Sequence, residues 1–315
     1  MTPSSRRIGA LVMAYGTPPS PEQIEAFYTD VRRGRPPSAE QLAKLTRRYE
    51  AIGGVSPLAR HTAEQVAGIQ HQLELRSPGS YLCVLGNKHS EPRIESAVEY
   101  LHTQGVRGLV GLVLAPHYSR GSVGEYVSRA TEQATGLAMS ATFVEHWHED
   151  PVLIELLAER VANALETLGP HGIDARHNGR LLLLVTAHSL PLRVVADGDP
   201  YADQLRRSAE LVASAAGLRR FDIGWQSAGR TPEPWLGPDI LERLRALPSQ
   251  GVDAVVICPA GFTSDHLEVL YDLDIEASRV AAEVGVTFAR TASLNADPRM
   301  CAALADLVID RAQEL

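Results

Sequence analysis

The most apolar run of the chain, LLLLVTA at 181–187, leads directly into a histidine, His188. Such a run is typical of a buried parallel strand, and open α/β sheets bind ligands beyond the carboxyl ends of their strands. An imidazole at that point titrates near neutrality and can accept protons or contact a metal ion. A histidine that merely caps a strand end is the alternative, and position alone leaves both interpretations open.

Three acidic residues recur four positions apart in the segment SDHLEVLYDLDIEA, namely Glu268, Asp272 and Glu276. On a helix this spacing predicts one acidic stripe, with a rise of roughly 6 Å per step. Like charges at this spacing oppose helix formation, and a divalent cation passing along the stripe would offset them. Two alternatives remain open: a solvated acidic face, or a capping box between Asp265 and Glu268.

A basic cluster lies within the segment FYTDVRRGRPPSAEQLAKLTRRYEAIGGVSP. Guanidinium groups bind carboxylates through bidentate, charge-assisted hydrogen bonds, so the cluster favours a ligand that carries carboxylates. An exposed basic helix and loop is the alternative. The arginines are Arg32, Arg33, Arg35, Arg47 and Arg48, and Tyr28, Tyr49 and Ser56 accompany them.

Short apolar runs alternate along the chain with amphipathic helical patterns. This alternation predicts βαβ units and parallel sheets. The order also repeats, since IGALVMAYGTP resembles RLLLLVTAHSLP and GVRGLVGLVLAPHYS resembles GVDAVVICPAGFTSDH. We therefore expect an α/β fold of two Rossmann-like domains, 1–165 and 166–315, with the active-site cleft between them. Whether the C-terminal helix packs on the first domain is left open. The expected strands are 8–14, 81–86, 109–114, 181–186, 222–225 and 254–258; the expected helices include 39–51, 62–75, 93–104, 152–168, 201–216, 239–247 and 267–284.

Composition excludes several classes of protein. The 315 residues contain 38 acidic and 30 basic side chains, a net charge of −8, which argues against a nucleic-acid-binding protein. No run approaches the 18 apolar residues of a membrane-spanning helix. The three cysteines have no CxxC spacing, which argues against a disulfide scaffold and a cysteine-rich zinc site and fits a reducing compartment. No glycine-rich phosphate-binding motif follows a strand, so a nucleotide cofactor is disfavoured.

Taken together, an ordered set of segments resembles the ferrochelatases, and most of all the soluble coproporphyrin ferrochelatases of Gram-positive bacteria. Each segment alone is a weak signal, but the set runs in the family's order from about residue 8 to 300. The segments are LVMAYGTP, FYTDVRRGR, RYEAIGGVSPL, KHSEP, LAPHYS, AHSLP, GDPY, GWQSAGRTPEPWLGPD and GFTSDHLEVLYDLDIE.

The resemblance implies a chelatase-like fold and a role for each candidate residue. His188 and Glu268 match the catalytic pair that also contacts the metal, and Asp272 and Glu276 match a path for it. Tyr15 matches a tyrosine that faces the metal from the other side of the macrocycle. The set that would bind the porphyrin propionates is Arg32, Arg33, Arg48, Tyr49, Ser56 and Tyr126. Fe²⁺ is then a substrate, and no cofactor is expected. An iron–sulfur cluster needs four ligands, whereas the chain has only three cysteines.

Coproporphyrin III carries four propionates and protoporphyrin IX two, so the rich arginine and hydroxyl set favours coproporphyrin III. The segment DVRRGRPPSAEQL is charged and polar, where mitochondrial protoporphyrin enzymes have an apolar lip. We accordingly expect a cytoplasmic monomer without membrane insertion or nucleic-acid partner, open to transient contact with other haem-pathway enzymes. The alternatives are a protoporphyrin IX ferrochelatase, a sirohydrochlorin-type chelatase and a non-catalytic haem-binding protein.

Overall fold

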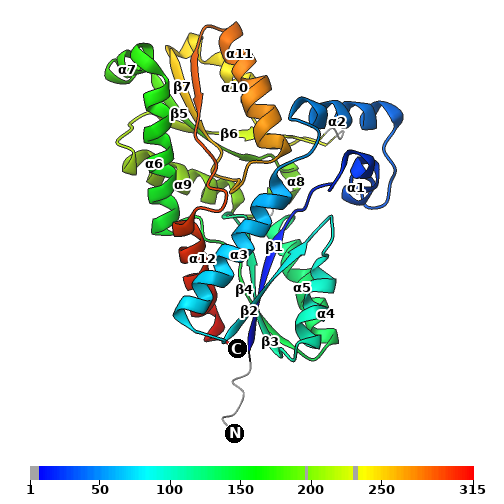
Figure 1. The fold of residues 1–315 in the computed structure, drawn as a ribbon. Helices are drawn as coiled ribbons and strands as arrows, with labels where there is room; N and C mark the ends of the chain where they lie inside the picture. Colours follow the sequence, from blue (N-terminus) through cyan, green and yellow to red (C-terminus); the bar gives the residue numbers. More distant parts are fainter. Residues whose placement is uncertain (1–6, 196–197, 230–232) are drawn as a thin grey trace. The chain divides into compact units, whose positions relative to one another are not determined.

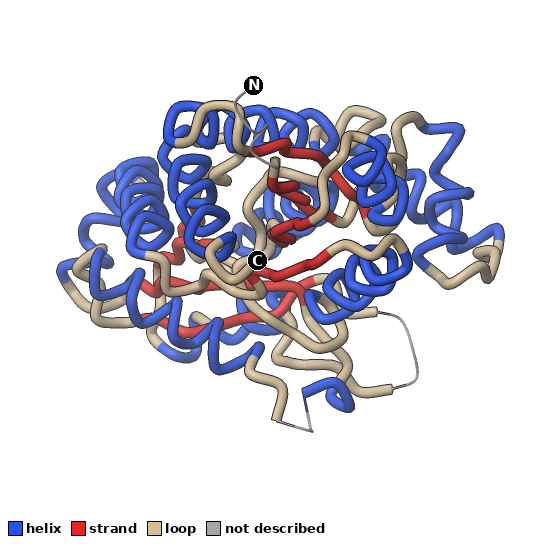
Figure 2. The backbone as a smooth tube through the Cα atoms, turned by 90° about the horizontal axis from the view of Figure 1, so that it is seen from below, coloured by secondary structure: helices blue, strands red, loops and turns tan. Residues whose placement is uncertain are grey.

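The computed structural model describes residues 7–195, 198–229 and 233–315, which fall into two compact units. The first unit comprises the chain up to Ala115, Gly121–His146 and Asn295–Leu315; the second comprises Pro116–Arg120 and Trp147–Leu294. Each unit is built on a parallel four-stranded sheet with helices on both faces (Figure 1). The strands of both sheets are drawn in red among blue helices in Figure 2. The predicted α/β fold with two Rossmann-like, parallel-sheet domains is confirmed.

In the first unit the strand order is β2-β1-β3-β4, and the central β1 is buried from Gly9 to Ala14. Helices α3 and α12 pack on one face of the sheet, and α4 and α5 on the other. The strands are β1 (Ile8–Ala14), β2 (Tyr81–Asn87), β3 (Gly108–Val113) and β4 (Ser140–Val144). The helices are η1 (Pro21–Gln23), α1 (Ile24–Val31), α2 (Ala39–Ala51), α3 (Leu58–Arg76), α4 (Ile94–Thr103), α5 (Val123–Gly136) and α12 (Pro298–Ala312).

The second unit repeats this arrangement with the order β6-β5-β7-β8, so the predicted internal repeat holds at the level of topology. Helices α6, α7 and α9 pack on one side of the sheet, and η3, α10 and α11 pack together on the other. The strands are β5 (Leu181–His188), β6 (Phe221–Gln226), β7 (Ala254–Cys258) and β8 (Thr287–Arg290). The helices are α6 (Pro151–Thr167), α7 (Gly169–His177), α8 (Leu192–Val195), α9 (Tyr201–Ala215), α10 (Ile240–Ala246), η2 (Pro248–Gln250), the π-helix η3 (Val269–Ala277) and α11 (Ser278–Glu283).

All six predicted strands are present, but β4 and β8 were not predicted. Both lie at the edge of their sheets, and most of their residues are partly exposed. A strand that is only half-buried needs no continuous apolar run, so the pattern that identified the central strands is absent from SATFV and TFAR.

The chain crosses between the units at different points from the predicted boundary at 165/166. The chain enters the second unit after His146 and not after residue 165, because α6 packs on α9 and on strands β7 and β8 of the second sheet. After Leu294 the chain returns, and α12 packs on α3, β3 and β4 of the first unit. The sequence predicted a connector between the domains in the glycine- and histidine-rich stretch GPHGIDARHNGR at 169–180, but its first nine residues form α7 within the second unit. A single boundary placed there cannot detect the later return of the chain.

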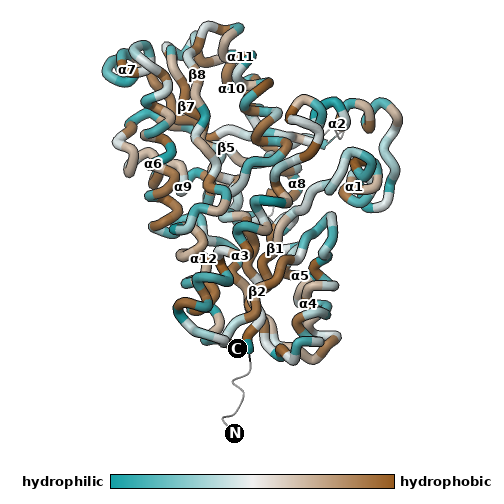
Figure 3. Tube along the Cα trace, viewed as in Figure 1, coloured by the Kyte–Doolittle hydropathy of each residue, from teal (hydrophilic) through white to brown (hydrophobic). Residues whose placement is uncertain are grey.

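Apolar residues follow the sheets, whereas polar residues dominate α2 (Figure 3). The β5 residues Leu181–Ala187 are all buried, and only the last residue of the strand, His188, is partly exposed. Within the described ranges, we find no helix that is both long and apolar enough to cross a bilayer.

Candidate active site

His188 occupies the carboxyl end of β5, where the buried strand reaches its first partly exposed residue. The Nδ1 atom donates to the Ser189 carbonyl oxygen at 2.5 Å, which fixes the orientation of the ring. The other nitrogen, Nε2, faces Glu268, and its distance to the carboxylate Oε1 is 3.5 Å. The structure therefore brings together two of the predicted residues, 80 positions apart in sequence, because β5 and β7 are neighbours and end at the same edge.

Glu268 lies between two histidines, since Oε2 is also 3.6 Å from Nε2 of His266. Burial raises the pKa of Glu268, but the charges of His188 and then His266 outweigh it and hold that pKa well below its ordinary value. Conversely, burial lowers the pKa of His188, but Glu268 outweighs it and brings that pKa to about 9. At neutral pH the pair is therefore an imidazolium beside a carboxylate.

The titration of His188 gives a direct test of this pairing. In the wild-type protein we expect the imidazole to titrate near pH 9, because the ionised Glu268 stabilises its charged form. In a Glu268→Gln variant burial, the Ser189 hydrogen bond and the smaller effect of the Asp272 charge remain, so the pKa should fall toward its ordinary value of about 6.5. NMR titration of the His188 ring measures both values. Equal pKa values in the two proteins would contradict the pairing.

Gln226, at the end of β6, is hydrogen-bonded to the segments that carry His188 and Glu268. Its side chain is fully buried, accepts a hydrogen bond from Thr186 at 2.9 Å and donates to the Glu268 backbone carbonyl at 3.4 Å. The amide thus links β5, β6 and the segment that carries Glu268. The sequence placed Gln226 and His266 among the polar residues that follow predicted strands, but it assigned neither of them a role in the site.

The predicted acidic stripe has a different geometry from that of an α-helix. Residues 269–277 form a π-helix, in which hydrogen bonds span five residues, so a spacing of four no longer corresponds to one turn. Asp272 is 6% exposed and accepts a hydrogen bond from the Ser227 hydroxyl at 2.5 Å, whereas Glu276 is only half-buried. Over the described part of the chain, no three His, Cys, Asp or Glu side chains converge on a preformed metal position.

The alternative capping box is not supported by the structure. Asp265 accepts hydrogen bonds from Ser293 at 2.8 Å and from Arg290 at 3.2 Å. Glu268 instead pairs with the two histidines, and no side-chain hydrogen bond caps η3. Glu268 is thus committed to the histidine cluster and not to the helix start.

In the first unit, Tyr15 follows the end of β1 and is 44% exposed. Its ring packs against His89 at 4.6 Å between centroids and meets the edge of Phe27 at 6.4 Å. The next residue, Gly16, has a φ of +87°, and a Cβ there would lie 2.3 Å from Ser90 Oγ. Only a glycine at position 16 therefore allows Ser90, in the loop after β2, to lie so close to the backbone next to Tyr15.

His89 belongs to a hydrogen-bonded group that the sequence did not predict. Its Nδ1 is 2.7 Å from Asp30 Oδ2, and Arg93 donates to both oxygens of that carboxylate at 3.1 and 2.9 Å. The hydrogen bond from Arg93 lowers the pKa of Asp30, and burial lowers the pKa of His89. The result is a neutral imidazole with its proton on Nδ1. His89 lies in the KHSEP segment and Asp30 in FYTDVRRGR, while Arg93 comes directly after KHSEP, so these two segments were the available signal.

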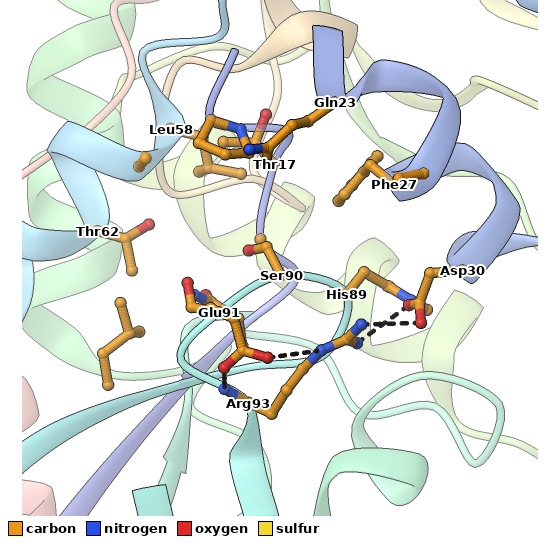
Figure 4. Close-up of a pocket in the computed structure, with 16 residues that line it drawn as sticks. Thr17, Gln23, Phe27, Asp30, Leu58, Thr62, His89, Ser90, Glu91 and Arg93 are labelled. Carbon is orange, nitrogen blue, oxygen red and sulfur yellow. Dashed lines mark hydrogen bonds and ion pairs between the residues drawn. The ribbon is translucent and has the colours of Figure 1, made fainter. Parts of the chain in front are cut away.

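A pocket of about 530 Å³ opens beside this group (Figure 4). Its walls come from α1, the start of α3 and the loop after β2. Phe27 and Leu58 give it an apolar side, while Asp30, His89 and Arg93 line another part. The pocket thus adjoins the residues that support Tyr15.

The predicted propionate-binding residues all lie in the first unit. Arg32 and Arg33 follow α1, Arg48 and Tyr49 occupy the last turn of α2, Ser56 precedes α3, and Tyr126 lies on α5. Arg32 stacks over the Tyr28 ring at 5.4 Å, and Arg33 has a φ of +57°, which is unusual for a side-chain-bearing residue and typical of functional sites.

Tyr49, Ser56 and Tyr126 are buried, and burial raises the pKa of the Tyr126 hydroxyl well above its ordinary value. Lys88 lies 5.2 Å above the Tyr126 ring and forms an ion pair with Glu125 at 2.7 Å. The hydroxyl of Tyr126 consequently stays a hydrogen-bond donor beside a buried cation. Lys88 was not predicted as a site residue.

Comparison with known proteins gives a consistent result over the whole chain. The sequence model of the Ferrochelatase family matches residues 7–312. A protein of Anoxybacillus flavithermus named coproporphyrin III ferrochelatase is 46% identical over 310 residues, covering 98% of this chain and 97% of its own. A protein of the same name from Bacillus subtilis is 45% identical over 311 residues, covering 98% and 99%.

Among solved structures, a similar fold is found in the sirohydrochlorin chelatase SirB from Bacillus subtilis subspecies spizizenii, in complex with cobalt. The TM-score is 0.58 and the sequence identity 11%, and the match covers 98% of this chain and 96% of that one. The siroheme-biosynthesis enzyme CbiX matches with a TM-score of 0.54 and 16% identity, covering 96% and 99%. At these identities the two structures show a shared fold.

Proposed function

Because the chain belongs to the ferrochelatase family, we propose that it inserts Fe²⁺ into coproporphyrin III to give iron coproporphyrin III. The observation that carries the proposal is the pairing of His188 with Glu268 at 3.5 Å, since metal insertion needs a proton acceptor beside a metal-binding carboxylate. The similarity to relatives named coproporphyrin III ferrochelatase supports the choice of porphyrin.

Insertion requires the loss of two pyrrole protons, and the charge state of the pair suggests how they are accepted. In the resting protein His188 holds a proton because Glu268 is ionised beside it. A divalent cation that reaches Glu268 competes with the imidazolium for the carboxylate, lowers the pKa of His188 and releases its proton. The neutral imidazole can then accept one pyrrole proton, release it to solvent and accept the second. Tyr15 contributes its hydroxyl to the metal, and Asp272 and Glu276 supply metal ions to Glu268.

The propionates bind the basic and hydroxyl-bearing residues of the first unit. Arg32, Arg33 and Arg48 provide bidentate donors, and Tyr49, Ser56 and Tyr126 provide hydroxyl groups. Binding energy from these remote groups can hold the macrocycle in a bent form that exposes its nitrogen lone pairs. Coproporphyrin III engages more of these donors than protoporphyrin IX because it has twice as many propionates.

An anaerobic assay with Fe²⁺ and coproporphyrin III tests the proposal. Repeated turnover, followed by the absorption of the metallated product, is expected. A spectral change that stops at one equivalent of porphyrin per protein would identify a binding protein instead. The same assay with cobalt and sirohydrochlorin tests the alternative of a sirohydrochlorin-type chelatase.

Competition between porphyrins is expected to favour coproporphyrin III. Each additional well-desolvated arginine–propionate contact contributes about 1.5–3 kcal/mol, so kcat/KM should exceed that for protoporphyrin IX by at least tenfold. The measurement uses both porphyrins in detergent-free buffer at matched concentrations. An equal or higher kcat/KM for protoporphyrin IX would overturn the substrate assignment while leaving the reaction type intact.

The enzyme works without a resident cofactor, with iron serving as substrate. Burial raises the pKa of Cys83 and of Cys258 to about 12 and that of Cys301 to about 11, so these thiols are protonated core groups. We propose a cytoplasmic monomer without an iron–sulfur cluster, since a cluster needs four ligands and the chain has three cysteines. Contacts with other haem-pathway enzymes are transient, and neither nucleic acid nor membrane is a partner.

A further inference from the structure

The GDPY segment at 198–201 is one of the segments that resemble the ferrochelatases, and it lies at the start of α9. Gly198 has a φ of +77°, a conformation that favours glycine. Asp199 and Tyr201 are both buried, at 8% and 7% exposure, and Tyr201 is the first residue of α9. Two buried polar side chains at the start of one helix require partners, and their partners lead to His188.

Asp199 anchors the beginning of α9 within the second unit. One carboxylate oxygen accepts the backbone N–H of Tyr201 at 3.0 Å. The other accepts the backbone N–H of Arg120 at 2.7 Å and the hydroxyl of Ser119 at 3.2 Å. A carboxylate at a helix N-terminus is favourable, and these three bonds leave Tyr201 little freedom to move.

The ring of Tyr201 is held on two sides. Trp225 packs against it at 5.7 Å between centroids with an interplanar angle of 31°, and His117 meets it edge-on at 6.2 Å. This packing directs the hydroxyl to the backbone carbonyl oxygen of His188, to which it donates at 3.1 Å.

That carbonyl belongs to the peptide between His188 and Ser189, which is held at both ends. Its N–H, from Ser189, donates to the Gln226 carbonyl at 2.8 Å, and its C=O accepts from Tyr201. The following carbonyl, that of Ser189, is the acceptor for His188 Nδ1. The orientation of this peptide therefore sets the position of the Ser189 carbonyl, which accepts the hydrogen bond from Nδ1 of His188. With Nδ1 bound there, Nε2 on the other side of the ring faces Glu268.

We propose that Tyr201 is a positioning residue for His188: its hydroxyl holds the 188–189 peptide so that Nδ1 bonds Ser189 and Nε2 remains directed at Glu268. The inference rests on the proposed function, in which His188 accepts the pyrrole protons. Partners of this kind fix the tautomer and ring orientation of active histidines, and their loss reduces activity without removing a reacting group.

The test is Tyr201→Phe, which removes the hydroxyl and keeps the ring between Trp225 and His117. Tyr81→Phe is the matched control, because Tyr81 is also buried but begins β2 in the other unit. For both variants, kcat and the KM values of Fe²⁺ and coproporphyrin III are measured at a temperature where each is fully folded. The His188 ring resonances are recorded with ¹⁵N-labelled histidine and assigned by their loss in His188→Ala.

Tyr201→Phe should lower kcat about 10- to 100-fold, the range for partners that orient an active histidine. The KM of coproporphyrin III should stay within about twofold, since no porphyrin contact is lost. The Nδ1–H resonance of His188 should shift or broaden, and Tyr81→Phe should leave all three quantities unchanged. A Tyr201→Phe variant with wild-type kcat and an unaltered Nδ1–H resonance would overturn the proposal, even if its unfolding temperature fell.

The two readouts separate this inference from the function on which it rests. Absence of turnover in the wild-type protein would refute the proposed function alone, because the Nδ1–H resonance still reports whether Tyr201 orients the ring. Normal wild-type turnover with an unaltered resonance and unaltered kcat in Tyr201→Phe would refute the inference alone.

Discussion

Replacing His188 by alanine should reduce metal insertion by about 10²- to 10⁴-fold, the usual contribution of a proton-transferring side chain. The effect should fall on kcat, because the proposed propionate contacts lie in the first unit and His188 in the second. Stopped-flow absorption under anaerobic conditions measures the rate, and fluorescence quenching of coproporphyrin III measures its binding.

His171→Ala is the control for this change, since His171 is an exposed histidine on α7 of the same unit. It should retain the wild-type kcat and porphyrin affinity. A folded His188→Ala protein with near-normal turnover would refute the assignment of His188 as the proton acceptor.

Graded effects are expected along the acidic segment. Glu268→Gln should lower kcat by about 10²-fold or more, because the variant loses both the metal-binding carboxylate and the charge that sets the pKa of His188. Asp272→Asn and Glu276→Gln should instead raise the KM of Fe²⁺ about fivefold with little loss of kcat. That change corresponds to ~1 kcal/mol, the Coulomb energy of unit charges 4 Å apart in water.

Glu283→Gln serves as the control for the metal series, since Glu283 lies on the adjoining α11, half-exposed and paired with Arg279. It should change neither constant. If Asp272→Asn and Glu276→Gln also left the KM of Fe²⁺ unchanged, these carboxylates would not supply the metal. The chelatase proposal would then depend on His188 and Glu268 alone.

The two strongest site predictions came from residues at strand ends, and the reason is geometric. Parallel strands end at one edge of a sheet, so a histidine at the end of β5 and an acidic residue in the segment that follows β7 are brought to the same edge. His89 and Asp30 escaped prediction because they lie 59 residues apart and pair through a helix and a loop. No short-range pattern reports a contact of that kind.

The sequence by itself determined the fold class, the central strands, the internal repeat and the family, because continuous apolar runs and ordered motifs are local properties of the chain. Only the tertiary structure decided the return of α12 to the first unit, the π-helical geometry of residues 269–277 and the tautomer of His188. It also decided the charge of the His188–Glu268 pair, since Glu268, 80 residues away in sequence, outweighs burial and raises the pKa of His188 to about 9. Such properties depend on which groups meet in space, and that is set by packing over the whole unit.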